Sequence, residues 1–165
     1  MKKMIIFAVT VFFIGACAYA HRLYTVGKQS QAMDPPAVVG LECPDKPNCV
    51  SSLAKEGDTH RIDPLTDFGG DEPLAKIRTV LADMNIVISG DDPRFVHGEA
   101  TSKIFEFVDD VDIMVAEDEQ AAFHIRSASR VGYADMGVNL KRVEEIRRRL
   151  AIKSDGKVRD PGNTD

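Results

Sequence analysis

Apolar residues recur at helical spacing near the middle of the chain and again close to its C-terminal end. An apolar residue at every third or fourth position predicts a helix over residues 72–84, and Pro73 suits its first turn. The same spacing predicts a second helix over residues 139–152, with Val143, Ile146 and Leu150 on one side.

Between these helices, apolar and polar residues alternate in four runs, as expected for β-strands. Their expected ranges are 86–88, 94–102, 104–116 and 122–131. The connections are short, so consecutive strands should pair antiparallel. We therefore predict an α+β fold: a two-layer sandwich in which an antiparallel four-stranded meander sheet has a helix before it and a helix after it.

The last two strands carry enough apolar residues to predict how they pair. Val115 should lie opposite Phe123 because a shift of one residue would place apolar side chains against charges. This register sets Asp112 opposite Arg126, Asp110 opposite Ala128 with Arg130 diagonal to it, and Asp109 opposite Ser129.

The two faces of this hairpin differ in their polar residues. On one face acidic and basic residues alternate. We interpret that face as a solvated surface whose charged side chains form ion pairs with one another. On the apolar face, Asp109 shares a row with Ser127 and Ser129. Burial of Asp109 beside Phe107 and Val111 would be costly without hydrogen-bonding partners. The polar group is therefore either a structural clamp or part of a binding pocket.

The N-terminal segment has the composition of an export signal: a basic start followed by an apolar run over residues 4–20. Three outcomes stay open. The signal is cut before a lipidated Cys17 in the lipobox-like Ile14-Gly15-Ala16-Cys17, it is cut after Ala18-Tyr19-Ala20, or it remains as a membrane helix. All three place the domain in the cell envelope on the extracytoplasmic (periplasmic) side, and two tether it.

Composition along the chain predicts four parts. These are an export signal or membrane anchor over residues 1–20, a polar linker over 21–40, an α+β domain over 41–153 and a flexible tail over 154–165. Cys43 and Cys49 lie in the exported part as an even pair, and an oxidising compartment favours a disulfide between them.

Charge excludes some partners. The net charge is −5, so a nucleic-acid partner or a broad basic patch on anionic lipid is not expected. Asp109, Asp110 and Asp112 resemble part of a calcium loop but lie on a strand, without the twelve-residue spacing. We predict no metal and no cofactor. The expected partners are the membrane, through the N-terminus, and a small anionic ligand or an envelope protein.

Three strings resemble the domain-of-unknown-function family numbered 1499. They are Cys43-Pro44 with Pro47-Asn48-Cys49-Val50-Ser51-Ser52, then Phe105-Glu106-Phe107-Val108-Asp109-Asp110, then Arg-Ser-x-Ser-Arg-x-Gly-x-x-Asp-x-Gly-x-Asn from Arg126 to Asn139. The similarity extends from about Leu41 to Leu150. The resemblance implies a bacterial envelope or plastid-type protein, usually anchored or secreted, and it implies no activity.

Three hypotheses for the function remain. The first is a non-catalytic domain that presents donors to an anionic ligand or a partner protein: the guanidinium groups of Arg126, Arg130 and Arg142 and the backbone amides of the loop over residues 132–137. Its candidate residues are Arg126, Ser127, Ser129, Arg130, Asp135, Asn139, Asp109 and Asp110, although Asp135 or Asn139 is also suited to cap the second helix. The second is a hydrolase built from serine, histidine and aspartate residues, for which no catalytic motif is found. The third is a purely structural envelope module.

Overall fold

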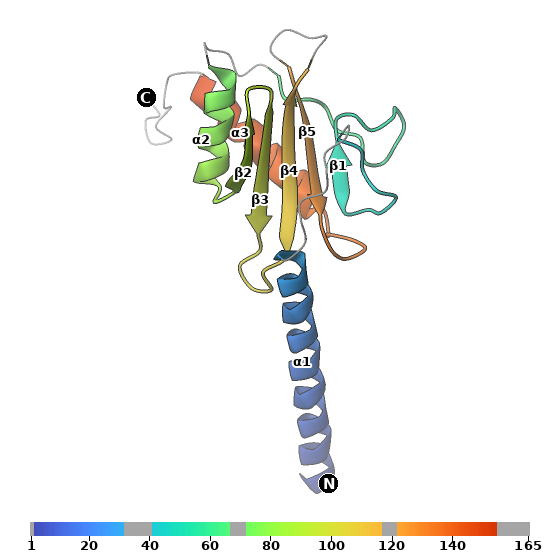
Figure 1. The fold of residues 1–165 in the computed structure, drawn as a ribbon. Helices are drawn as coiled ribbons and strands as arrows, with labels where there is room; N and C mark the ends of the chain where they lie inside the picture. Colours follow the sequence, from blue (N-terminus) through green and yellow to red (C-terminus); the bar gives the residue numbers. More distant parts are fainter. Residues whose placement is uncertain (1, 32–40, 67–71, 117–121, 155–165) are drawn as a thin grey trace, which may run out of the picture.

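A computed structural model describes residues 2–31, 41–66, 72–116 and 122–154. Its elements are the helices α1 (Lys2–Gln31), α2 (Pro73–Asp83) and α3 (Val138–Ser154) and the strands β1 (Cys49–Ser51), β2 (Val87–Asp92), β3 (Phe95–Thr101), β4 (Val108–Val115) and β5 (Phe123–Ser129). The strands form one antiparallel sheet in the order β1-β5-β4-β3-β2 (Figure 1).

The α+β class is confirmed, with α2 directly before the meander of β2 to β5 and α3 after it. The predicted four-stranded sheet is wrong, because β1 adds a fifth strand that pairs Val50 with Ser127. The third predicted strand also begins too early. Residues 102–107 turn instead, and Glu106 has a positive φ of 57°, which breaks an extended conformation.

The predicted register of the β4–β5 hairpin is confirmed at each predicted pair: Val115 with Phe123, Asp112 with Arg126, Asp110 with Ala128 and Asp109 with Ser129. The same register pairs Ile113 with Ile125. Apolar residues of the buried face therefore meet at two positions, which favours this register over a shift of one residue.

The core lies between one face of the sheet and the helices α2 and α3. Ile77 and Leu81 of α2 and Ile146 of α3 are fully buried against Ile113 and Ile125 of the sheet. Figure 1 shows α3 crossing the sheet diagonally while α2 lies beside β2. The opposite face of the sheet is therefore left to other parts of the chain.

Helix α1 is the longest element and leaves the sheet at one end (Figure 1). Its 30 residues extend over about 45 Å, and it is long and apolar enough to cross a membrane. We expected a linker from residue 21, but residues 21–31 continue the helix. Gly27 and Ser30 are buried against the domain, which gives these residues a reason to stay helical. The remainder of the expected linker, 32–40, lies outside the described residues, as does 155–165 of the expected tail.

The end of α1 approaches the domain so closely that only glycine fits at position 27. A β-carbon at Gly27 would lie 1.6 Å from the carbonyl oxygen of Phe105. Three residues later, the Ser30 hydroxyl accepts a 2.9 Å hydrogen bond from the Val108 N–H at the start of β4.

Replacing Gly27 with leucine is expected to separate α1 from the domain, because the Phe105 backbone has no flexible end that can yield. The Val108 amide, which donates to Ser30, should then exchange its hydrogen faster, while the mid-strand Ile113 amide keeps its protection. Hydrogen exchange followed by mass spectrometry measures both. Gly15→Leu is the matched control because nothing lies within 4 Å of that position. Unchanged exchange at Val108 in the Gly27 variant would contradict the docking.

Candidate functional site

The residues from Arg126 to Asn139 serve two sites on opposite faces of the sheet. Strand alternation sends Ser127 and Ser129 toward α3, whereas Arg126 points to the other face. We call the first site the clamp: Asp109, Ser127, Ser129, Asp135, Asn139 and Arg142. We call the second site the charge network: His97, Glu99, Asp110, Asp112, Arg126 and Arg130.

Asn139 is the centre of the clamp and is fully buried. Its Nδ2 donates to Asn48 O at 3.0 Å, to Ser129 Oγ at 3.0 Å and to Asp135 Oδ2 at 2.8 Å. Its Oδ1 accepts from the Ser127 hydroxyl at 2.7 Å. One side chain therefore connects the start of α3 to β5 and to the residue that precedes β1.

Arg142 supplies the partner that Asp109 needs on the apolar face. Its NH2 lies 2.6 Å from Asp109 Oδ2, and its NH1 donates to Ser127 Oγ and Asn139 Oδ1. We expected Arg142 to be a guanidinium donor to an anionic ligand, but in the structure this guanidinium binds residues of the clamp. Arg142 follows Asn139 by three residues and so lies on the same side of the helix.

Asp135 caps the loop that leads into α3. Its two carboxylate oxygens accept hydrogen bonds from the N–H groups of Gly137 and Asn139, at 2.9 and 2.8 Å. Burial would raise the pKa of Asp135, but these hydrogen bonds outweigh it and lower the pKa. The sequence predicted that Asp135 or Asn139 caps this helix, and Asp135 fills that role.

The charge network is buried, which corrects the expectation of a solvated surface. Asp112 is fully buried between His97 Nδ1 and Arg126 NH1, each at 2.6 Å. Asp110 is 1% exposed and accepts two hydrogen bonds from Arg130, at 2.9 and 2.7 Å.

Arg130 connects the network to two further elements. Its NH2 lies 2.6 Å from Glu99 of β3, and its NH1 donates to the Ser30 carbonyl near the end of α1. Burial would lower the pKa of Arg130, but its hydrogen bonds to Asp110 and Glu99 outweigh that and raise the pKa. The guanidinium is thus held between three elements, and its position near the C-terminal carbonyls of α1 is favourable for a cation.

His97 is the titrating member of the network. The hydrogen bond to Asp112 is the largest cause that raises the pKa of His97, and it outweighs burial, which lowers it. Asp110 and Glu99 add smaller effects in the same direction. Protonated His97 balances the charge, since three carboxylates then face two guanidiniums and one imidazolium.

The free energy of unfolding is therefore expected to fall as the pH rises above about 6.5, the ordinary histidine pKa. The folded-state pKa of His97 is raised, so the stabilisation from its positive charge is fully present below pH 6.5. This stabilisation is lost as the pH rises through the folded-state pKa. Denaturant unfolding from pH 6 to pH 9 measures this slope. His97→Gln should flatten it; His60, whose pKa is also raised, titrates in both proteins and cancels in the comparison. Equal slopes would contradict the assignment.

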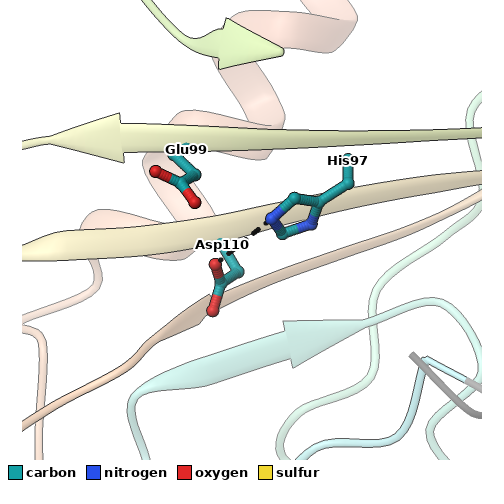
Figure 2. A group of neighbouring side chains, drawn as sticks. All are labelled: His97, Glu99 and Asp110. Atoms are coloured by element: carbon teal, nitrogen blue, oxygen red, sulfur yellow. Dashed lines mark ion pairs between the residues drawn. The ribbon is translucent and has the colours of Figure 1, made fainter. Parts of the chain in front are cut away.

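Three members of the network have a spacing that suits a metal ion. His97, Glu99 and Asp110 each place one ligand atom within 4.8 Å of the others, and Figure 2 shows the three side chains pointing toward one another. The Arg130 guanidinium already bridges Glu99 and Asp110. A divalent cation there would meet this positive charge at close range, so we propose no metal site.

A cavity of about 410 Å³ opens beside the charge network. Its lining combines the disulfide loop with residues of β4 and β5: Glu42, Cys43, Pro44, Lys46, Asn48, Asp110, Arg126, Ala128, Ser129 and Arg130. The predicted disulfide between Cys43 and Cys49 is present, with a Cα–Cα distance of 5.7 Å. The Ser51 hydroxyl donates to the Leu41 carbonyl at 2.6 Å and holds the start of this loop. The disulfide loop therefore forms one wall of the cavity.

Two residues of this lining each carry a buried polar atom that has no hydrogen-bond partner within the described part of the chain. These atoms are Arg126 Nε, a donor, and Asn48 Oδ1, an acceptor. Unpaired buried polar atoms are uncommon in folded proteins and call for an explanation, such as a water or a ligand.

The serines and histidines of the hydrolase hypothesis do not assemble an active site among the described residues. Ser52 Oγ lies 3.3 Å from His124 Nδ1, but Ser52 is buried and accepts a hydrogen bond from the Ile125 N–H. Ser127 is fully buried in the clamp. His60 pairs with Asp58 and the Lys46 carbonyl.

Fold and site together define a small α+β domain that follows an apolar helix long enough to be a signal or an anchor. Residues 41–150 match the family described as "Protein of unknown function (DUF1499)", so the chain belongs to the DUF1499 family and the predicted resemblance is confirmed. A comparison with curated proteins finds no match.

Proposed function

We propose that this protein is a membrane-tethered, non-catalytic domain of the cell envelope that binds a small anionic ligand in the cavity beside Arg126. The apolar helix α1 supports the tether. The disulfide supports an oxidising, extracytoplasmic location, because such bonds are rare in the cytosol. We retain the division into anchor, connecting segment, domain and tail, with the helix extended to Gln31.

The position of Arg126 is the observation that carries the proposal. Its NH1 is bound to Asp112, which fixes the guanidinium plane, while its Nε is buried and has no hydrogen-bond partner. Arg126 is also one of the residues that line the cavity. A guanidinium that is held by one carboxylate and carries a second, unpaired donor is preorganised for a carboxylate or phosphate oxygen. Lys46, also on the lining, adds a second positive charge.

The unpaired acceptor narrows the chemistry of the ligand. Asn48 Oδ1 requires a donor, so a ligand that satisfies both atoms carries an anionic oxygen and an O–H or N–H group. A hydroxy acid or a monoprotonated phosphate has both.

The structure separates our eight candidate residues into two groups. Arg126, Arg130, Asp110 and Ser129 line the cavity. Of these, Arg126 is our candidate for the ligand site, because Arg130 and Asp110 pair with each other and Ser129 Oγ accepts a hydrogen bond from Asn139. Asp109, Ser127, Asp135 and Asn139 do not line the cavity, and with Ser129 they form the clamp, where their polar atoms bind one another and Arg142. We assign this second group to holding α3 on the sheet.

Thermal unfolding of the full chain in mild detergent tests the proposal, with inorganic phosphate and succinate as probes. A bound ligand raises the melting temperature, so at least one probe should do so. Arg126→Lys should abolish the rise, because lysine keeps the charge beside Asp112 but lacks the planar fork. Arg148→Lys, exposed on α3, is the matched control and should keep the rise.

Two results would overturn the proposal: no rise with either probe, or an equal rise in the Arg126 variant. They would favour the structural envelope module instead. One observation supports a structural module: most polar side chains of the clamp and the charge network form ion pairs or hydrogen bonds with other groups of the protein.

A further inference from the structure

The connection between β3 and β4 carries apolar side chains at the end of the sheet where α1 arrives. Ile104 is 78% exposed at its tip, next to Lys103 and to the half-buried Phe105. The loop from β5 to α3 begins at the same end of the sheet, where Ser129 lies opposite Asp109. Its side chains Tyr133 and Met136 are 72% and 93% exposed. Exposed apolar side chains that gather on one surface are typical of interaction sites.

The same connection is held against the candidate membrane helix. The Phe105 carbonyl packs on Gly27, and Glu106 forms an ion pair with Lys28. Gly27 follows the end of the apolar run, Ala20, by seven residues, which is about 10 Å along a helix. Figure 1 shows this connection beside the top of α1.

The distance of about 10 Å from the apolar run to Gly27 corresponds to the headgroup region of a bilayer. Tyr24, between the apolar run and Gly27, is 43% exposed, and its ring lies 5.6 Å from the Lys28 ammonium. Tyrosine and lysine at such a height are typical of the headgroup region. A loop fixed one to two helical turns above the apolar run, with an aliphatic tip, therefore faces lipid rather than bulk water.

We infer that the β3–β4 connection is a second membrane contact: Ile104 enters the boundary between headgroups and acyl chains of the bilayer that α1 crosses. The inference rests on the proposed membrane tether. The occupant of this apolar end is lipid, because the helix fixed to it leads directly into the bilayer.

The chain contains no tryptophan, so a single introduced tryptophan reports one position. The full chain is reconstituted in vesicles of phosphatidylethanolamine and phosphatidylglycerol, with and without brominated acyl chains that quench tryptophan. Ile104→Trp should emit at shorter wavelength and lose most of its fluorescence to the brominated lipid. Pro93→Trp, exposed on the turn between β2 and β3 at the opposite end of the sheet, should show neither change.

Phe12→Trp, exposed within α1, separates the tether from the loop contact. If position 12 is quenched and position 104 behaves like position 93, the second contact is overturned while the tether stands. If position 12 is not quenched, both are overturned. Lys103→Trp, at the adjacent exposed position, replaces Ile104→Trp if that variant does not fold, and the same results decide.

Discussion

Replacing Arg130 with alanine is expected to lower the free energy of unfolding by about 3–5 kcal/mol, the usual cost of breaking a buried ion pair. Asp110 is 1% exposed and accepts two hydrogen bonds from Arg130. Without the guanidinium, this carboxylate and Glu99 remain close together, and the nearest basic group left to Asp110 in the network is His97, whose Nε2 lies 3.6 Å away. Denaturant unfolding of the full chain in mild detergent measures the loss.

Arg148→Ala is the matched control for this variant. Arg148 also pairs with a carboxylate, Glu145, but on the exposed side of α3. Exposed pairs contribute little, so the control should leave the free energy of unfolding nearly unchanged. An equally small loss for Arg130→Ala would show that the fold does not require this arginine.

Replacing Asn139 with alanine should lower the free energy of unfolding by about 3 kcal/mol or more, because several buried groups lose their partner together. The Ser127 hydroxyl and the Asn48 carbonyl would each lose a hydrogen bond inside the protein. Asn139→Asp should be similarly costly, since its second oxygen would face the Asn48 carbonyl and Asp135 in place of a donor. The same unfolding measurement applies.

Lys141→Ala serves as the control on the same helix, because Lys141 is exposed. It should change the free energy of unfolding by less than about 0.5 kcal/mol. If Asn139→Ala and Lys141→Ala unfold at the same denaturant concentration, the clamp does not hold α3 on the sheet.

The pairing of β4 with β5 could be predicted because strand side chains alternate with a period of two. Only one register matches Ile113 with Ile125, and it sets Asp112 beside Arg126. Arg130 lies one residue beyond β5, so its proximity to Asp110 follows from the same register. The alternation of apolar and polar residues within the two strands was therefore enough to predict which charged residues lie opposite each other.

Burial of those charges could not be predicted, because it depends on distant parts of the chain. The disulfide loop shares the cavity with Arg126, and the end of α1 reaches Arg130 through the Ser30 carbonyl. His97 and Glu99 were missed for a different reason. Alternation in β3 places both on the face of Asp110, and extending the register by one more strand would have identified them.

The short strand β1 and the helical continuation of α1 lacked a local signal. Three residues are too few to show alternation, and β1 is defined by its pairing with β5. Residues 21–31 are polar, and their helical state is supported by the contact of Gly27 and Ser30 with the domain.

We propose that Arg126 binds a ligand, whereas Arg130 stabilises the fold. The Nε–H resonances of the two arginines in one ¹⁵N NMR spectrum of the full chain in micelles test this directly, with Arg126→Lys assigning the first. On addition of phosphate or succinate, the Arg126 Nε–H signal should move, because that donor is unpaired, and the Arg130 signal should stay, because it already donates to Asp110. An unmoved Arg126 signal with both probes, or equal movement of both signals, would contradict the claim.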